Sequence, residues 1–222
     1  MFNEKFLSIH IPKTGQEALL EKEIKKIGKQ REKRINKKWD EELTRYQGVE
    51  SAIQDIERHR KIELSMTLTL LLSGNYISYY PYSDRMLDSE KRGVSYSKKY
   101  NGKILILGRF EESFLAEMYE AGELVSKVFF MEDEVVETMA PELIFDNVRL
   151  ETLIDEPIDE EDERYWQKED FEKLDTFFQE KYHIFADEPR FDKLEQLKFV
   201  DDSDGVRIYD SSEYFEKQGI SV

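Results

Sequence analysis

The sequence has no cysteine among its 222 residues. This absence excludes disulfides, thiolate catalysis, zinc ribbons and cysteine-ligated iron–sulfur clusters, and it is typical of a reducing compartment. No apolar run approaches the roughly 18 residues that span a bilayer, and the first residues lack the apolar core and cleavage site of a signal peptide. We therefore expect a cytoplasmic protein that does not bind membranes.

Positive charge is scarce in the last two fifths of the chain. Residues 132–222 contain 10 Lys and Arg against 29 Asp and Glu, whereas residues 1–62 contain 15 against 11. The formal net charge of the whole chain is −16, yet 13% of its residues are aromatic, which argues against disorder throughout. The imbalance indicates either a separate acidic part or one acidic face of a single body.

The N-terminal quarter predicts a strand followed by helix. Residues 6–12 alternate in polarity and end at Pro12, as a strand does. From about residue 16 to 61, apolar residues return every three or four positions, which predicts an amphipathic helical segment. Because a glycine costs a helix interior about 1 kcal/mol, this segment is either one long helix or a helical hairpin that folds near Gln47 and Gly48.

The middle of the chain predicts strands. Alternating or apolar stretches occupy residues 62–72, 76–82, 94–100, 103–110, 114–120 and 124–131. Asn101-Gly102 is typical of a two-residue hairpin turn, because both residues tolerate positive φ. We expect an antiparallel β-meander of about six strands.

The remainder predicts mostly helix. We expect a short helix at 132–139, a strand at 143–150, a helix that begins near Asp162, a helix at 189–199, and a turn at 201–205 before a strand at 206–209. The expected fold class is α+β, with a long N-terminal helical segment, the meander, and an acidic, mainly helical C-terminal portion. Residues 1–151 and 152–222 form two parts or a single domain.

The candidate partner-binding residues are acidic. Residues 155–163 place seven carboxylates in nine positions, and three more aspartates follow near residue 203. Such a run is either a solvated linker or a surface that resembles a phosphate backbone to a basic protein. We assign partner binding to Asp155, Glu156, Asp159, Glu160, Glu161, Asp162, Glu163, Asp201, Asp202 and Asp204.

A basic stretch opposes this acidity. Residues 22–38 contain nine Lys and Arg and only two acids, Glu23 and Glu32. The stretch could grip phosphates, form a solvated helix face, or lie against the acidic half of the same protein. Because a net charge of −16 repels a polyanion elsewhere, we do not expect nucleic acid as the partner.

One short motif suggests an enzyme instead. His10-Ile11-Pro12-Lys13-Thr14-Gly15 follows a strand and precedes a helix, and it resembles the phosphosulfate-binding loop of sulfotransferases. The resemblance implies a parallel α/β sheet and a phosphorylated donor held by Lys13, Thr14 and Gly15. Gln16 departs from the small residue expected after this loop.

No other motif defines a reaction. The three histidines lie far apart in the sequence and form no zinc-binding pair, so we expect neither metal nor cofactor. We expect a non-enzymatic acidic protein that neutralises a basic protein, such as an immunity protein or inhibitor of a nuclease-like toxin or defence protein. The alternatives are the sulfotransferase-like enzyme and a structural assembly protein that uses its amphipathic helix.

Overall fold

The computed structural model describes residues 5–13, 15–65, 68–73, 75–80, 89–110, 113–131, 134–138, 144–149, 168–186, 189 and 191–220. The helices are α1 (Glu17–Arg45), α2 (Glu50–Ser65), α3 (Ser89–Lys99), α4 (Lys168–Tyr182), α5 (Phe191–Leu194) and α6 (Ser212–Lys217). The strands are β1 (Lys5–Pro12), β2 (Leu68–Leu72), β3 (Tyr76–Tyr80), β4 (Ile104–Phe110), β5 (Ser113–Glu120), β6 (Glu123–Met131), β7 (Glu134–Thr138), β8 (Ile144–Phe145), β9 (Val148–Arg149), β10 (Lys198–Ser203) and β11 (Val206–Asp210). The expected α+β class is confirmed.

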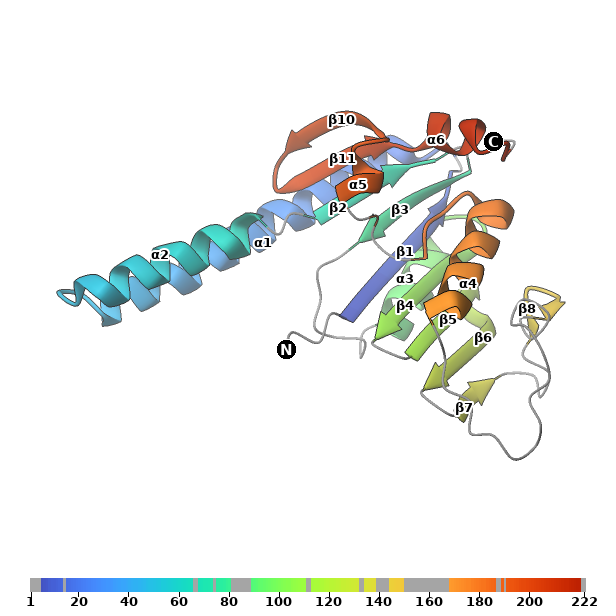
Figure 1. Cartoon of the computed structure of the whole chain (residues 1–222), viewed down its shortest axis with the longest axis horizontal. Helices are drawn as coiled ribbons and strands as arrows, with labels where there is room; N and C mark the ends of the chain where they lie inside the picture. Colours follow the sequence, from blue (N-terminus) through green and yellow to red (C-terminus); the bar gives the residue numbers. More distant parts are fainter. Residues whose placement is uncertain are drawn as a thin grey trace.

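Nine of these strands form one sheet, in the order β10-β11-β2-β3-β1-β4-β5-β6-β7 (Figure 1). β11 runs parallel to β2, and the other neighbouring pairs in this described sheet are antiparallel. The predicted six-strand meander is therefore wrong in its extent. β4 to β7 do follow one another, but β1 lies between β3 and β4, where both of its faces are buried.

The two faces of the sheet carry separate cores. Leu7, Ile9 and Ile11 of β1 face one side, where they join Leu20 and Ile24 of α1 in a buried cluster. A second cluster, on the opposite face, joins residues of β4, β5 and β6 to α4, and a third packs α6 near β2 and β3. Helices thus cover both sides, because the strands of the sheet centre bear apolar residues on both faces.

The helical segment is a hairpin, as one of the two alternatives predicted. α1 and α2 are joined by a turn at 46–49, where Gly48 has a φ of +91°. Ile35 of α1 and Ile56 of α2 are buried, and Trp39 stacks on His59 with ring centroids 6.2 Å apart. The hairpin extends well beyond the sheet (Figure 1).

The strand expected at 62–72 is wrong at its start. α2 continues to Ser65, and β2 begins at Leu68. Contacts with α1 hold this extra turn of helix: Arg31 donates to the backbone oxygen of Glu63, and Lys38 and Trp39 donate to its carboxylate at 2.9 and 2.7 Å. These tertiary contacts stabilise the helix more than the local alternation favours a strand.

The hairpin expected around Asn101-Gly102 is also wrong. Residues 89–99 form α3, so the turn connects a helix to β4. Gly93, Ser97 and Tyr100 are all buried on one side of this helix, a spacing that the strand interpretation missed. Gly102 still needs its glycine, because its φ is +108°.

The elements predicted between residues 114 and 150 are confirmed only in part. The hairpin of β5 and β6 is confirmed, with positive φ at Ala121 and Gly122. The short helix expected at 132–139 is wrong, because residues 134–138 pair with β6 as a strand. The strand expected at 143–150 is divided into β8 and β9 around a turn.

The described residues of the acidic C-terminal portion combine helices with strands, whereas a mainly helical portion was expected. α4 confirms part of the helix predicted to begin near Asp162, but the helix expected at 189–199 is reduced to the four residues of α5. β10 and β11 add two strands to the main sheet. Their turn, Asp204-Gly205, has φ values of +59° and +72°, which suit a tight hairpin.

Gly28 positions α1 on this turn, which leads to a stability prediction. A Cβ at residue 28 would collide with the carbonyl oxygen of Asp204 and lie 2.8 Å from a methyl of Val206. Gly28→Ala adds about 1 kcal/mol of helix propensity, but overpacking against backbone costs about 1–3 kcal/mol. We expect a net loss of stability in urea unfolding, whereas Gln30→Ala on the exposed side should be neutral or stabilising. A more stable Gly28→Ala variant would contradict this packing.

Candidate binding surface

The predicted acidic residues fall in two regions. Asp155, Glu156 and the five acids at 159–163 lie outside the described residues. Asp201 and Asp202 lie on β10, and Asp204 lies in the turn to β11. The structure therefore brings together three of the ten candidates on one hairpin of the sheet.

Two of these three aspartates pair with lysines of α1, and the third, Asp202, lies 3.7 Å from Arg207 of β11. Lys25 donates to Asp201 at 2.6 Å, and Lys29 lies 2.9 Å from Asp204. The hydrogen bond from Lys25, followed by that from Ser203, holds the pKa of Asp201 below its usual range. Part of the basic stretch at 22–38 thus lies against the protein's own acidic residues, which is one of the three alternatives that the sequence left open.

Asp202 is the most exposed of the three aspartates. Its side chain is 51% exposed, with Arg207 at 3.7 Å. Next to it on β10, Phe199 and Val200 are 57% and 49% exposed, an uncommon level for large apolar residues in a strand. Phe199 packs edge to face on Tyr209, with ring centroids 5.7 Å apart.

β10 forms one edge of the sheet, and no described strand lies on its outer side. An edge strand presents backbone donors and acceptors on that side, and natural proteins usually protect such edges. We call Lys198, Phe199, Val200 and Asp202 the β10 edge. It combines exposed apolar side chains, a carboxylate and an open strand edge, which together can bind an extended segment of another protein.

The turn expected to bind phosphate has other partners. The backbone N–H of Lys13 donates to the carbonyl of Asn75 at 2.9 Å, and that of Gly15 donates to Glu17 at 3.3 Å. Thr14 lies outside the described residues. A carboxylate already occupies the start of α1, and the sheet is not the parallel sheet that the sulfotransferase resemblance implies.

A buried polar cluster escaped the sequence analysis. His10 is fully buried, its Nδ1 lies 2.7 Å from the Ser78 hydroxyl, and its Nε2 lies 2.8 Å from the Ser8 hydroxyl. Ser8 donates to the carbonyl of Ala186 at 3.1 Å. When the Ser8 hydroxyl donates to this carbonyl, Nε2–H of His10 donates to Ser8, and Ser78 donates to Nδ1.

This cluster contains the serine and histidine side chains of many catalytic sites, but it is closed to substrates. Ser8 and Ser78 are each 1% exposed, so a substrate cannot reach either hydroxyl. Burial lowers the pKa of His10 to about 3, which keeps its ring neutral. The cluster therefore joins β1, β3 and the segment after α4. The alternation of Ser8 and His10 with apolar residues was the signal that placed both on one face.

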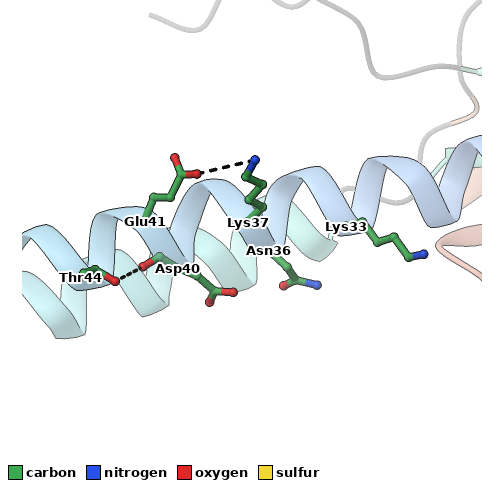
Figure 2. Close-up of a pocket in the computed structure, with 6 residues that line it drawn as sticks. All are labelled: Lys33, Asn36, Lys37, Asp40, Glu41 and Thr44. Atoms are coloured by element: carbon green, nitrogen blue, oxygen red, sulfur yellow. Dashed lines mark hydrogen bonds and ion pairs between the residues drawn. The ribbon is translucent and has the colours of Figure 1, made fainter.

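The exposed side of α1 carries a shallow polar stripe (Figure 2). Six polar residues form it: Lys33, Asn36, Lys37, Asp40, Glu41 and Thr44. Its bases lie toward the sheet and its acids lie toward the hairpin turn. The basic stretch at 22–38 was interpreted from the sequence as one unit, without the change of sign that follows it at Asp40.

Comparison with known proteins finds no relative. No protein-family model, curated protein or solved structure matches the chain. Function must therefore be argued from the surfaces themselves. Among the described residues, no group of three or more His, Asp or Glu side chains is arranged to hold a metal ion. No helix within the described ranges has the length and apolarity to cross a bilayer.

Proposed function

We propose that the protein is a non-enzymatic acidic binding protein that neutralises a basic protein, as an immunity protein or inhibitor neutralises a nuclease-like toxin or defence protein. The observation that carries the proposal is the charge of residues 132–222, in which 29 acids stand against 10 bases. Such a surface attracts a cationic partner over a distance and accelerates its association.

Two regions would share the binding. The seven carboxylates of residues 155–163 would occupy the phosphate-binding cleft of the partner. The β10 edge supports a second contact, because Phe199 and Val200 supply apolar area beside the carboxylate of Asp202. Asp201 and Asp204 would contribute less, since Lys25 and Lys29 already neutralise them.

Affinity capture with a matched variant tests the proposal. The wild-type chain and a variant with all seven carboxylates of 155–163 changed to amides are immobilised and exposed to extract from the source cells. We expect a basic protein to bind the wild type and to be lost from the variant. With that protein purified, the association rate should fall steeply as salt rises, because exposed charges are screened beyond about 10 Å at 0.1 M salt.

Further variants locate the contact and exclude the alternative. Asp202→Asn should weaken binding, whereas Asp192→Asn, an exposed aspartate on α5, should not. Capture of no basic protein, or equal capture by the amide variant, contradicts the proposal. Thermal stabilisation by 3′-phosphoadenosine 5′-phosphate that disappears in Lys13→Ala would support the sulfotransferase-like enzyme instead.

A further inference from the structure

The hairpin of α1 and α2 separates its charges along its length. Residues 22–38 contain nine Lys and Arg against two acids, and residues 58–63 contain three against one. Residues 39–57 contain six acids against one base, Arg45. We call 22–38 with 58–63 the basic shaft and 39–57 the acidic tip.

The sign changes at the same height on both helices. Arg60 of α2 donates to Asn36 at 2.7 Å and to Asp40 at 2.9 Å, which brings these levels of the two helices together. On α1 the change lies between Lys38 and Asp40, and on α2 it lies between Glu57 and Arg58. At most levels of the hairpin, the two neighbouring helices therefore carry charges of the same sign.

Ion pairs between the two helices gather near this boundary. Lys38 pairs with Glu63, and Arg60 pairs with Asp40. On α1 itself, Lys37 lies 3.9 Å from Glu41, an exposed contact that an opposite charge on another molecule can replace. Farther from the boundary the charges keep their sign: Lys33 and Lys61 of the shaft, and Glu50 and Asp55 of the tip, form no ion pair with any residue that the structure describes. The bases gathered in the shaft repel one another within one molecule, and so do the acids gathered in the tip. This arrangement favours a partner with the opposite order of charge.

The polar stripe of Figure 2 carries bases at one end and acids at the other, so a second copy in the antiparallel direction presents the opposite order of charge. Its side chains are well exposed: Lys37 is 80%, Asp40 63% and Glu41 59% accessible. Rotating the stripe by half a turn, about an axis between residues 38 and 39, places Lys37 of one copy against Asp40 of the other. The same rotation places Asn36 against Glu41 and Lys33 against Thr44.

We propose that two copies of this chain associate through this stripe, with their α1 helices antiparallel and each basic shaft against the acidic tip of the other copy. Because the contact is two-fold, each favourable pair forms twice and the assembly closes as a dimer. A polyanion fits less well, since the tip would repel what the shaft attracts.

The dimensions of the hairpin allow this overlap. The same two-fold axis places the turn at 46–49 of one copy opposite about residue 30 of the other. The two α1 helices therefore overlap over about 27 Å, at a rise of 1.5 Å per residue. The overlap ends near Gly28, where the β10–β11 turn packs on α1. The two sheets thus lie at opposite ends of the dimer. Because the contact is polar and exposed, it is weak and salt-sensitive.

Charge reversal tests the dimer with an internal rescue. We expect the wild type to show a concentration-dependent dimer by analytical ultracentrifugation at low salt. K33E/K37E and D40K/E41K should each raise the dimer dissociation constant about tenfold or more. Their equimolar mixture should restore dimerisation, because each reversed shaft then meets a reversed tip.

The matched control is K22E/K26E. It changes the net charge by the same amount as K33E/K37E on the same helix, but residues 22 and 26 lie outside the overlap, so dimerisation should persist. Far-UV circular dichroism checks that each variant is folded. A second measurement uses the cysteine-free chain: an equimolar mixture of K37C and D40C should form a disulfide-linked heterodimer under mild oxidation, because residue 37 of one copy lies against residue 40 of the other, and a mixture of K22C and D40C should not.

Three outcomes would overturn the proposal. The first is a wild type that stays monomeric at low salt and at its highest soluble concentration, including one that binds nucleic acid through the shaft as a monomer. The second is undiminished dimerisation in both reversed variants. The third is failure of their mixture to associate when both variants are folded.

Discussion

The free energy of unfolding should fall by about 1.4 kcal/mol for each pH unit as the pH drops from about 6.5 toward about 3, through the single residue His10. Burial of its ring lowers the pKa of His10 from 6.5 to about 3. The unfolded chain therefore binds a proton in this range that the folded chain does not. The stabilisation is complete above about pH 6.5 and is lost as the pH falls.

The variant that isolates this effect is His10→Gln. Glutamine retains one donor and one acceptor for Ser8 and Ser78, and it does not titrate. Urea unfolding at several pH values should show a slope for the wild type, and a much smaller one for the variant, between about pH 6.5 and about pH 4.5. Burial also lowers the pKa of His183, which leaves a residual slope of the same sign.

Two features keep this prediction specific. The lowered pKa values of Glu23, Glu63 and Asp146 cost stability at more acidic pH, below their ordinary values of 3.8 to 4.5, so measurements above that range separate them from His10. His59→Gln, at an exposed position of α2, is the matched control substitution for His10→Gln. Identical slopes in wild type and His10→Gln would show that His10 is accessible to water in the folded protein.

Phe178→Ala should destabilise the protein by about 3–5 kcal/mol, because it removes the centre of an aromatic cluster. Phe178 of α4 is fully buried. Its ring lies between 5.1 and 6.0 Å, centroid to centroid, from those of Phe114, Phe145, Phe177 and Tyr182. The cavity would separate α4 from β5 and from the β8–β9 hairpin.

Urea unfolding measures this loss, and Phe177→Ala provides the control. Phe177 is adjacent in sequence but only half-buried, so its truncation should cost distinctly less. Phe178→Leu should recover part of the stability. A loss below about 1 kcal/mol for Phe178→Ala would mean that α4 does not pack on the sheet as described.

Predictions from the local pattern were confirmed where residues close together in the sequence determine the structure. The alternation of residues 6–12 is present in β1, and positive φ at Ala121 and Gly122 allows the two-residue hairpin of β5 and β6. The helical periodicity predicted the helical segment, and Gly48 made the hairpin of α1 and α2 one of its two alternatives. In each case the turn chemistry and the exposed face are set by neighbouring residues.

Predictions failed where distant contacts decide. Residues 94–100 alternate like a strand, but Gly93 packs on the ring of Tyr119 and Ser97 accepts from the N–H of Gly122, so the segment is helical. Residues 134–138 pair with β6 rather than forming a helix. Tyr119 and Gly122 lie about 25 residues beyond their partners on α3, so no local pattern contains them. The β7 failure is different, because its partners on β6 are only 3 to 10 residues away and the local pattern was misread.

Some properties of the candidate surfaces are likewise determined by the sequence, and others only by the folded structure. The excess of acids at 132–222 and the reversal of charge along residues 22–63 are properties of the sequence alone, since charge needs no partner to exist. Folding alone decided that Lys25 and Lys29 neutralise Asp201 and Asp204, that β10 lies at a sheet edge, and that His10 is buried. Each of these depends on which segments meet in space, and the sheet order joins strands that are far apart in the chain.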